Sequence, residues 1–118
     1  MEVNIILEES AFIVEAEGKK LRVSYKEDCL PYKEARKFCK ENGGGYETVE
    51  NLRFLAKHRD SINEVLKEKG YTELSSWYWS NEESWRYSDS AFIVSSRNGN
   101  VDDNDMYRNY RVRAVSAL

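Results

Sequence analysis

The sequence predicts an α+β fold made of small antiparallel sheets and two to three helices. Three observations support this fold class: short apolar runs typical of strands in the first 25 residues, apolar residues at helical spacing in the middle third, and β-type residues between turn formers after residue 70. A chain of 118 residues can bury roughly 65% of its unfolded surface, which is enough for one core. We therefore expect a single domain over residues 1–118.

Residues 1–30 are expected to form N-terminal strands, because their apolar residues alternate with polar ones or come in short bursts. The apolar residues are Val3, Ile5, Leu7, Phe12, Val14, Leu21, Val23 and Tyr25. The run Glu17-Gly18-Lys19 supplies a turn between the second strand and the third. Pairing of these strands with a strand at the end of the chain would close the domain.

Residues 31–70 are expected to be helical. Pro31 suits the first position of a helix, and the apolar residues after it recur at helical spacing as far as the glycines at 43–45. Thr48 is the predicted N-cap of a second helix, and the basic residues 57–59 suit the C-terminus of that helix.

A third short helix is predicted from Ser61 to Gly70. Glu64 follows Ser61 by three residues, which is the capping-box pattern, and glycine is typical of a helix end. His58 lies among charged residues before this helix, so we expect it at a solvated helix end. A catalytic role is not expected, since a general base needs a partner held within reach. A chain with one histidine also excludes a two-histidine zinc site.

Residues 71–118 combine strands with polar loops. Strands are expected at residues 77–79, 91–94 and 112–115. Asn98-Gly99 is a hairpin turn signal. The region between residues 81 and 111 is dominated by Ser, Asn, Asp, Tyr and Arg, as antibody binding loops are. Ordinary polar loops are rich in the same turn formers, so composition alone does not decide between the two interpretations.

The net charge and the length of the apolar stretches limit the classes of partner that the chain can bind. The net charge is −3 and the pI is near 5.3, whereas nucleic-acid and anionic-membrane surfaces need clustered Lys and Arg. All nine lysines lie at or before Lys69. No apolar stretch reaches the roughly 20 residues that span a bilayer. We expect a protein or glycan partner, no nucleic acid and no membrane insertion.

Two cysteines, Cys29 and Cys39, allow one disulfide at most, which is too few for a disulfide scaffold. We expect both as reduced, half-buried thiols, with Cys39 on the apolar side of the first helix. The sequence leaves open whether they pair.

Two further motifs each allow two interpretations. The rings of Trp77-Tyr78-Trp79 suit a sugar-stacking platform, but alternate residues of a strand point to opposite faces, so we expect burial in the core, above all for Trp79. The run Asp102-Asp103-Asn104-Asp105 offers oxygen ligands for calcium but lacks the glycine and the later glutamate of an EF-hand loop. Since four adjacent side chains cannot all face one ion, we expect solvated loop residues, no metal and no cofactor.

Four motifs follow one another in the C-terminal third: Tyr78-Trp79-Ser80, Ala91-Phe92, Asn98-Gly99-Asn100-Val101 and Val112-Arg113-Ala114-Val115. With the upstream segments PYKEARKFCKENGGG and SINEVLKEKG, these motifs resemble small bacterial and phage domains of the C-type-lectin-like fold, over residues 31–118. The chain departs from that family at Tyr46-Glu47-Thr48, where the family has Leu-Pro-Thr, and at Ala114, where it has proline.

The family includes the variable proteins of diversity-generating retroelements, in which a reverse transcriptase rewrites the 3′ end of a gene with errors at adenines. The resemblance implies a non-catalytic receptor-recognition protein with a fixed scaffold and a diversified C-terminal surface. Residues 100–111 mostly fit the residues that a mutated asparagine codon yields. Met106 and Trp85 lie outside that set.

The binding face implied by the resemblance lies on segments 85–89 and 100–111, with tyrosines as aromatic anchors and arginines as forked donors. Its expected residues are Trp85, Arg86, Tyr87, Ser88, Asp89, Asn100, Asp102, Asp103, Asn104, Asp105, Tyr107, Arg108, Asn109, Tyr110 and Arg111. The expected ligand is a protein or glycan on a cell surface. The N-terminus lacks the basic start of a secretory signal, which favours a virion-associated protein, or a cytoplasmic one before assembly.

Two rival functions belong to the same fold. Formylglycine-generating enzymes depend on reactive cysteines in the C-terminal half of their domain, whereas Cys29 and Cys39 come early, so we expect no enzyme activity. The other rival is a static structural or assembly module of a phage or bacterial particle.

Overall fold

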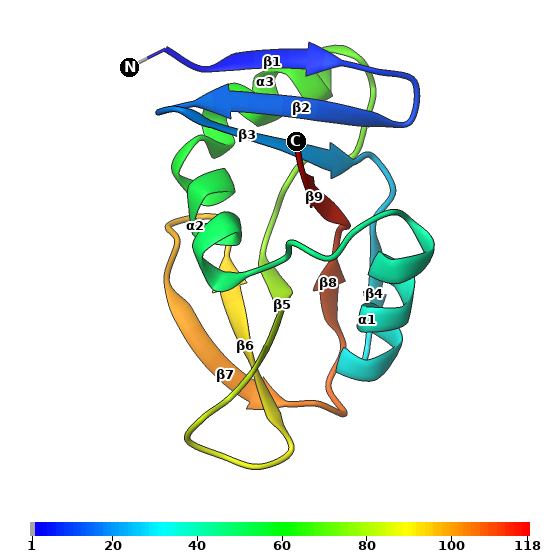
Figure 1. Ribbon diagram of the computed structural model, residues 1–118, viewed down its shortest axis with the longest axis vertical. Helices are drawn as coiled ribbons and strands as arrows, with labels where there is room; N and C mark the ends of the chain where they lie inside the picture. The colour runs from blue at the N-terminus through cyan, green and yellow to red at the C-terminus, as the bar shows by residue number, and fades with distance from the viewer. Residues whose placement is uncertain (1) are drawn as a thin grey trace.

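The computed structural model describes residues 2–118, which form three helices and nine strands in two small sheets (Figure 1). The first sheet has the order β1-β2-β3-β9, with β1 at Asn4–Leu7, β2 at Ala11–Ala16, β3 at Lys19–Ser24 and β9 at Val115–Ala117. The second sheet has the order β4-β8-β5-β6-β7, with β4 at Asp28–Leu30, β8 at Tyr110–Val112, β5 at Trp77–Glu83, β6 at Ser90–Ser95 and β7 at Val101–Asp105. The predicted α+β fold class is confirmed.

The first sheet joins the two ends of the described chain, which is the pairing that would close the domain. β9 pairs antiparallel with β3, with Val115 opposite Val23. The predicted turn between β2 and β3 is also confirmed, since Glu17 and Gly18 have φ of 53° and 75°, the left-handed values that a tight hairpin requires.

The second sheet differs from the expectation of purely antiparallel pairing. β5 and β8 meet at one residue pair, Tyr78 with Arg111, and this pairing is parallel. Hairpins force neighbouring strands to run antiparallel, but β5 and β8 are far apart in the chain and are brought together by packing. The expected strand 112–115 is in fact split between β8 and β9, which belong to different sheets.

The helices are α1 at Tyr32–Glu41, α2 at Val49–Lys57 and α3 at Arg59–Glu68. Pro31 precedes α1 as its N-cap, one position before the predicted one. The Thr48 cap is confirmed, because its side chain accepts a hydrogen bond from the backbone N–H of Asn51 at 3.0 Å.

Two expectations are wrong at the junction of α2 and α3: the residue at which α3 begins, and the solvent exposure of His58. α3 begins at Arg59, not at Ser61, because His58 both ends α2 and precedes α3 without a break long enough for a separate cap. His58 is buried, at 7% exposed, and not solvated. Its Nε2 lies 3.2 Å from Glu17 Oε2, and its ring packs edge-on against Phe54. The pKa of the Glu17 carboxyl is lowered by hydrogen bonds to Lys57 and to His58.

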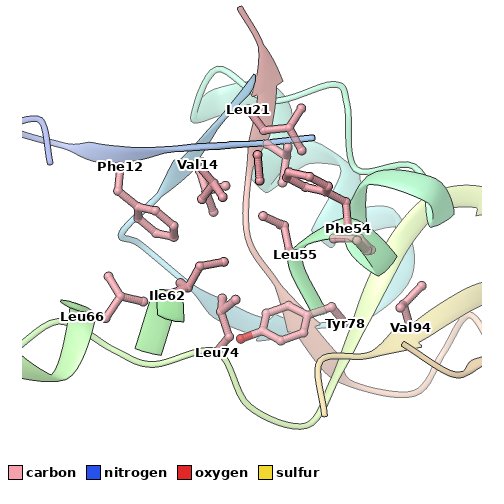
Figure 2. Close-up of a cluster of buried hydrophobic side chains, with 14 residues drawn as sticks. Phe12, Val14, Leu21, Phe54, Leu55, Ile62, Leu66, Leu74, Tyr78 and Val94 are labelled. Carbon is pink, nitrogen blue, oxygen red and sulfur yellow. The ribbon is translucent and has the colours of Figure 1, made fainter. Parts of the chain in front are cut away.

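Two apolar clusters lie on opposite faces of the second sheet. The larger cluster fills the space between the first sheet, α2, α3 and one face of the second sheet, where Tyr78 and Val94 contribute (Figure 2). The smaller cluster packs Trp79 and Ile93 against α1. Neighbouring residues of a strand point to opposite faces, so Tyr78 and Trp79 anchor β5 on both sides.

The burial predicted for Trp79 is confirmed. Its side chain is 1% exposed, and Nε1 donates to the Leu30 carbonyl at 2.7 Å. Trp77 is half-buried and packs against the same smaller cluster. The three aromatic residues therefore belong mainly to the two cores and do not form an open stacking platform.

Glu47 is a fully buried carboxylate, at 0% exposed, with four partners in three parts of the fold. Oε1 accepts from Arg36 Nη2 at 2.6 Å, and Oε2 accepts from the backbone N–H of Gly45 at 2.9 Å and of Val115 at 2.6 Å. The Glu47 carbonyl accepts from the N–H of Asn81 at 2.8 Å. One residue thus joins α1, β9 and β5.

Replacing Glu47→Ala is expected to lower the free energy of unfolding by about 3 kcal/mol, because removing one member of a buried ion pair leaves the other uncompensated. Urea unfolding followed by circular dichroism measures the effect. Glu50→Ala is the matched control, since the Glu50 side chain is 87% exposed and lies 3.9 Å from Lys19, and no measurable change is expected there. Equal losses in the two variants would contradict the role given to Glu47.

Candidate ligand-binding face

Two loops meet at the end of the second sheet that lies farthest from β1 (Figure 1). One is the β5–β6 loop, residues 84–89, and the other is the β7–β8 connection, residues 106–109. The backbone N–H of Met106 donates to the carbonyl of Asp89 at 2.9 Å and joins them. The fold therefore brings the predicted segment 85–89 next to the C-terminal part of the predicted segment 100–111.

The most exposed large side chains of the β5–β6 loop are Trp85, at 81% exposed, and Tyr87, at 60%. The Arg86 guanidinium lies 5.6 Å from the centre of the Trp85 ring and 5.8 Å from that of Tyr87, within the range of cation–π attraction. Trp85 also lies over Phe92, with 6.4 Å between the ring centres. We call Trp85, Arg86, Tyr87 and Phe92, with Asp103, the aromatic cluster.

A hydrogen-bond network holds the aromatic cluster in place. Asp103 Oδ2 accepts from Arg86 Nη2 at 3.1 Å and from the Ser84 hydroxyl at 2.8 Å. The Ser84 oxygen accepts in turn from the backbone N–H of Arg86 and of Tyr87 at 3.1 and 3.3 Å. Asp89, with φ of 62°, lets the chain turn back into β6. The loop is thus ordered before any ligand arrives, which reduces the entropy lost on binding.

Strand alternation divides the acidic run of β7 between two faces. Asp103 pairs with Phe92 on the face of the aromatic cluster, whereas Asn104 pairs with Ala91 on the opposite face. Asn104 Nδ2 donates to the Tyr110 hydroxyl at 2.6 Å, and the Tyr110 ring packs edge-on against Trp79. Asn104 and Tyr110 therefore support the smaller core.

Arg111 also has a partner inside the fold. Its Nη1 donates to Glu27 Oε2 at 2.5 Å, and this bond raises the pKa of Arg111. Glu27 Oε1 accepts from Arg113 Nη2 at 2.6 Å and from the Tyr78 hydroxyl at 2.5 Å. Burial raises the pKa of Tyr78. The Arg111 guanidinium is thus committed to a structural network.

The structure accordingly departs from the expected single solvent-facing patch. Four predicted residues are partly buried and bonded within the fold: Asp103, Asn104, Tyr110 and Arg111. Eleven are exposed: Trp85, Arg86, Tyr87, Ser88, Asp89, Asn100, Asp102, Asp105, Tyr107, Arg108 and Asn109. Asn100 lies at the other end of β7, near the hairpin turn at Gly99, and so stands apart from the two loops. Asp102 shares its face with Ile93, away from the aromatic cluster.

Tyr107 is 81% exposed and lies in the second loop. Its backbone N–H donates to Asp105 Oδ1 at 2.9 Å, which orients the start of that loop. A hollow between Tyr107 and Asp89 is lined on its other side by Pro31, Lys33 and Glu34. Sequence reasoning missed this contribution from the start of α1, because nothing local in residues 31–34 indicates which loop lies against them.

The charges near the two loops are of both signs. Asp89 and Asp105 are exposed there together with Arg86 and Arg108, and Lys33 is the one lysine that lines the hollow beside Tyr107. Within residues 2–118, no group of three or more His, Cys, Asp or Glu side chains is placed to hold a metal ion. In the acidic run itself, the Asp103 carboxylate already has Arg86 and Ser84 as partners.

Both cysteines are free, but neither is half-buried as expected. Cys29 is exposed on β4, and Cys39 is buried on α1. Burial raises the pKa of the Cys39 thiol to about 12. The difference arises because β4 lies at an edge of its sheet, whereas Cys39 faces the smaller core.

No protein-family model, curated protein or solved structure matches the chain. None of the helices in residues 2–118 has the length and apolar character needed to cross a membrane.

Replacing Ser84→Ala is expected to speed hydrogen exchange of the Arg86 and Tyr87 amides about fivefold, since each loses a hydrogen bond worth about 1 kcal/mol. Exchange followed by NMR measures this directly. Ser88→Ala is the control in the same loop, because Ser88 is exposed and is expected to leave both rates unchanged. Unchanged rates in Ser84→Ala would contradict the proposed ordering of the loop.

The two thiols are expected to react at very different rates with a thiol reagent such as 5,5′-dithiobis(2-nitrobenzoic acid) at pH 8. One equivalent, from Cys29, reacts at once in the native protein, and the second, from Cys39, reacts only on unfolding. Cys29→Ser removes the fast equivalent and Cys39→Ser leaves it. Two fast equivalents in the native protein would contradict the burial of Cys39.

Proposed function

We propose that this protein is a non-catalytic ligand-binding protein that recognises a protein or glycan on a cell surface. The observation that carries the proposal is the exposure of three large aromatic side chains, Trp85, Tyr87 and Tyr107, on two adjoining loops. These loops contain most of the face implied by the family resemblance.

The physical argument starts from the free energy of exposing such rings. Leaving a large apolar side chain in water forgoes roughly 1.5–3 kcal/mol of burial free energy, so aromatic rings on ordered loops favour a role in contact. Trp, Tyr and Arg are also the residues that dominate binding energy at interfaces. Arg86 contributes in two ways, because it supports both neighbouring rings and remains partly exposed, with 45% of its side chain accessible.

We further propose that the fold is C-type-lectin-like and that a retroelement diversifies the face. The ordered motifs from Tyr78-Trp79-Ser80 to Val112-Arg113-Ala114-Val115 support this. The division between core and surface is compatible with it: Trp79 and Val112 are buried, whereas residues 107–109, which fit the asparagine-derived set, are exposed. Substitutions at such exposed positions leave packing unchanged.

Binding is tested with a panel of immobilised glycans and with intact bacterial cells as probes. Trp85→Ala with Tyr87→Ala, and Tyr107→Ala with Arg108→Ala, are each expected to weaken binding at least tenfold, the effect of losing an interface hot spot. The melting temperature is expected to fall by no more than a few degrees. Tyr46→Ala is the control, because Tyr46 is 52% exposed away from the two loops. Loss of fold in the double variants, or equal loss of binding in the control, would refute the assigned face.

Diversification is tested by sequencing several kilobases on either side of the gene. A near-copy of the 3′ end that differs only at adenines, beside a reverse-transcriptase reading frame, is the expected result. Sibling copies are expected to differ within residues 85–111 and to share Val94, Val112 and Val115. Scattered variation and no near-copy would favour the static assembly module instead.

A further inference from the structure

The two sheets have four edges, and local bonds close three of them. Unpaired strand edges invite pairing with other chains, so proteins usually block them. At β9, the Val115 N–H donates to the buried Glu47 carboxylate and the Val115 carbonyl accepts from the N–H of Tyr46 at 3.0 Å. At β4, which is only three residues long, the Cys29 N–H donates to Asp28 Oδ1 at 2.7 Å.

The edge at β7 is blocked by its own side chains. The N–H of Asp103 donates to Asp102 Oδ1, and the N–H of Asp105 donates to Asn104 Oδ1, each at 2.8 Å. The pairing of Ser95 N–H with the Asn100 carbonyl sets the alternation of the β6–β7 ladder. By that alternation, Asp103 and Asp105 have their N–H groups on the outer side of the strand. These N–H groups are already satisfied, and the strand carries three negative charges.

The edge at β1 has none of these protections. The N–H of Glu8 donates to the Ala11 carbonyl at 2.9 Å, which sets the alternation of the β1–β2 ladder. Asn4 and Ile6 therefore face β2, and the backbone groups of Val3, Ile5 and Leu7 point outward. Within residues 2–118, no hydrogen bond is formed by these outward groups. β1 itself, Asn4–Leu7, carries no charge and no proline.

The side chains of β1 add an apolar component. Val3, Ile5 and Leu7 pack against the larger cluster but are only partly buried, because no strand lies beyond them. Ile6, on the outer face of the sheet, is 47% exposed. An added strand would extend the first sheet beyond β1 and would cover the side chains of Val3, Ile5 and Leu7.

We propose that a second copy of this chain pairs with β1 antiparallel about Ile5, so that two four-stranded sheets become one continuous sheet. In this register Ile5 lies opposite Ile5, and Val3 opposite Leu7. The N–H and carbonyl groups of these residues then bond reciprocally across the two-fold axis. A second copy suits this edge because the added strand must present apolar side chains at alternate positions beside Val3, Ile5 and Leu7, and the strand of a second copy has that pattern.

The charges at the ends of the strand are compatible with this register. Glu2 of one copy would lie opposite Glu8 of the other, and two bare carboxylates there would repel. Glu8 is already paired with Arg22, whose Nε lies 2.9 Å from Glu8 Oε1. β1 also lies at the far end of the molecule from the β5–β6 loop, so pairing leaves the candidate binding face of each copy open (Figure 1).

Sedimentation equilibrium of the full chain tests the proposal. The small interface places the expected Kd at roughly 10–1000 µM, so the mass is expected to rise from 13.8 kDa towards twice that value over this range. Ile6→Lys is expected to weaken association at least tenfold, because a charge on an edge strand opposes pairing. Val101→Lys is the matched control on β7, where Val101 is 40% exposed, and no effect is expected.

A second variant and a second readout separate pairing from folding. Ile5→Pro removes an outward N–H that β2 does not use, so the fold is expected to persist while association is lost. In the unmodified chain, the Ile5 and Leu7 amides are expected to become protected from hydrogen exchange as concentration rises, whereas Ile6 is protected throughout. A protein that stays monomeric at 1 mM, or a dimer that is equally sensitive to Ile6→Lys and Val101→Lys, would overturn the proposal.

Discussion

The buried carboxylate of Glu47 is the constraint on which the arrangement of both sheets depends. It bonds Arg36 of α1, the backbone of β9 and the loop at Gly45, while its own carbonyl binds β5. The approach is so close that a Cβ on Gly44 would lie 2.3 Å from Oε2, so position 44 has no room for a side chain. A buried charge is tolerated here because every one of its partners is in place.

The position of the two loops follows from that constraint. The Glu47 carbonyl bonds β5 at Asn81, inside the register shift between Trp79 and Glu83, and the alternation of Tyr78 and Trp79 anchors the strand in both cores. Beyond this point the chain leaves the core, and order comes from short local bonds around Ser84 and Asp103. The scaffold and the exposed loops are therefore stabilised by different sets of interactions. Changes at the tips of the loops leave the core contacts untouched.

The features that the sequence predicts well are local ones. The Glu17-Gly18 turn, the Thr48 cap and the burial of Trp79 follow from two or three neighbouring residues. The errors involve distant partners. Buried His58 lies beside Glu17, which is 41 positions earlier in the chain. Arg111 is bonded to Glu27, which is 84 positions earlier, and so does not belong to the binding face. Alternation along a strand divides the acidic run between two faces, but which face each residue of β7 takes depends on the register with β6, which no local pattern supplies.

The distribution of lysines has a practical consequence for handling the protein. All nine lie at or before Lys69, whereas the β5–β6 and β7–β8 loops have arginine as their only basic residue, with Lys33 alone at their border. Amine-directed reagents couple to lysine and leave guanidinium groups unchanged, because arginine stays protonated in proteins. With Lys33 replaced by arginine, a surface or dye attached through lysine side chains would be coupled outside the two loops and would leave their aromatic rings unmodified.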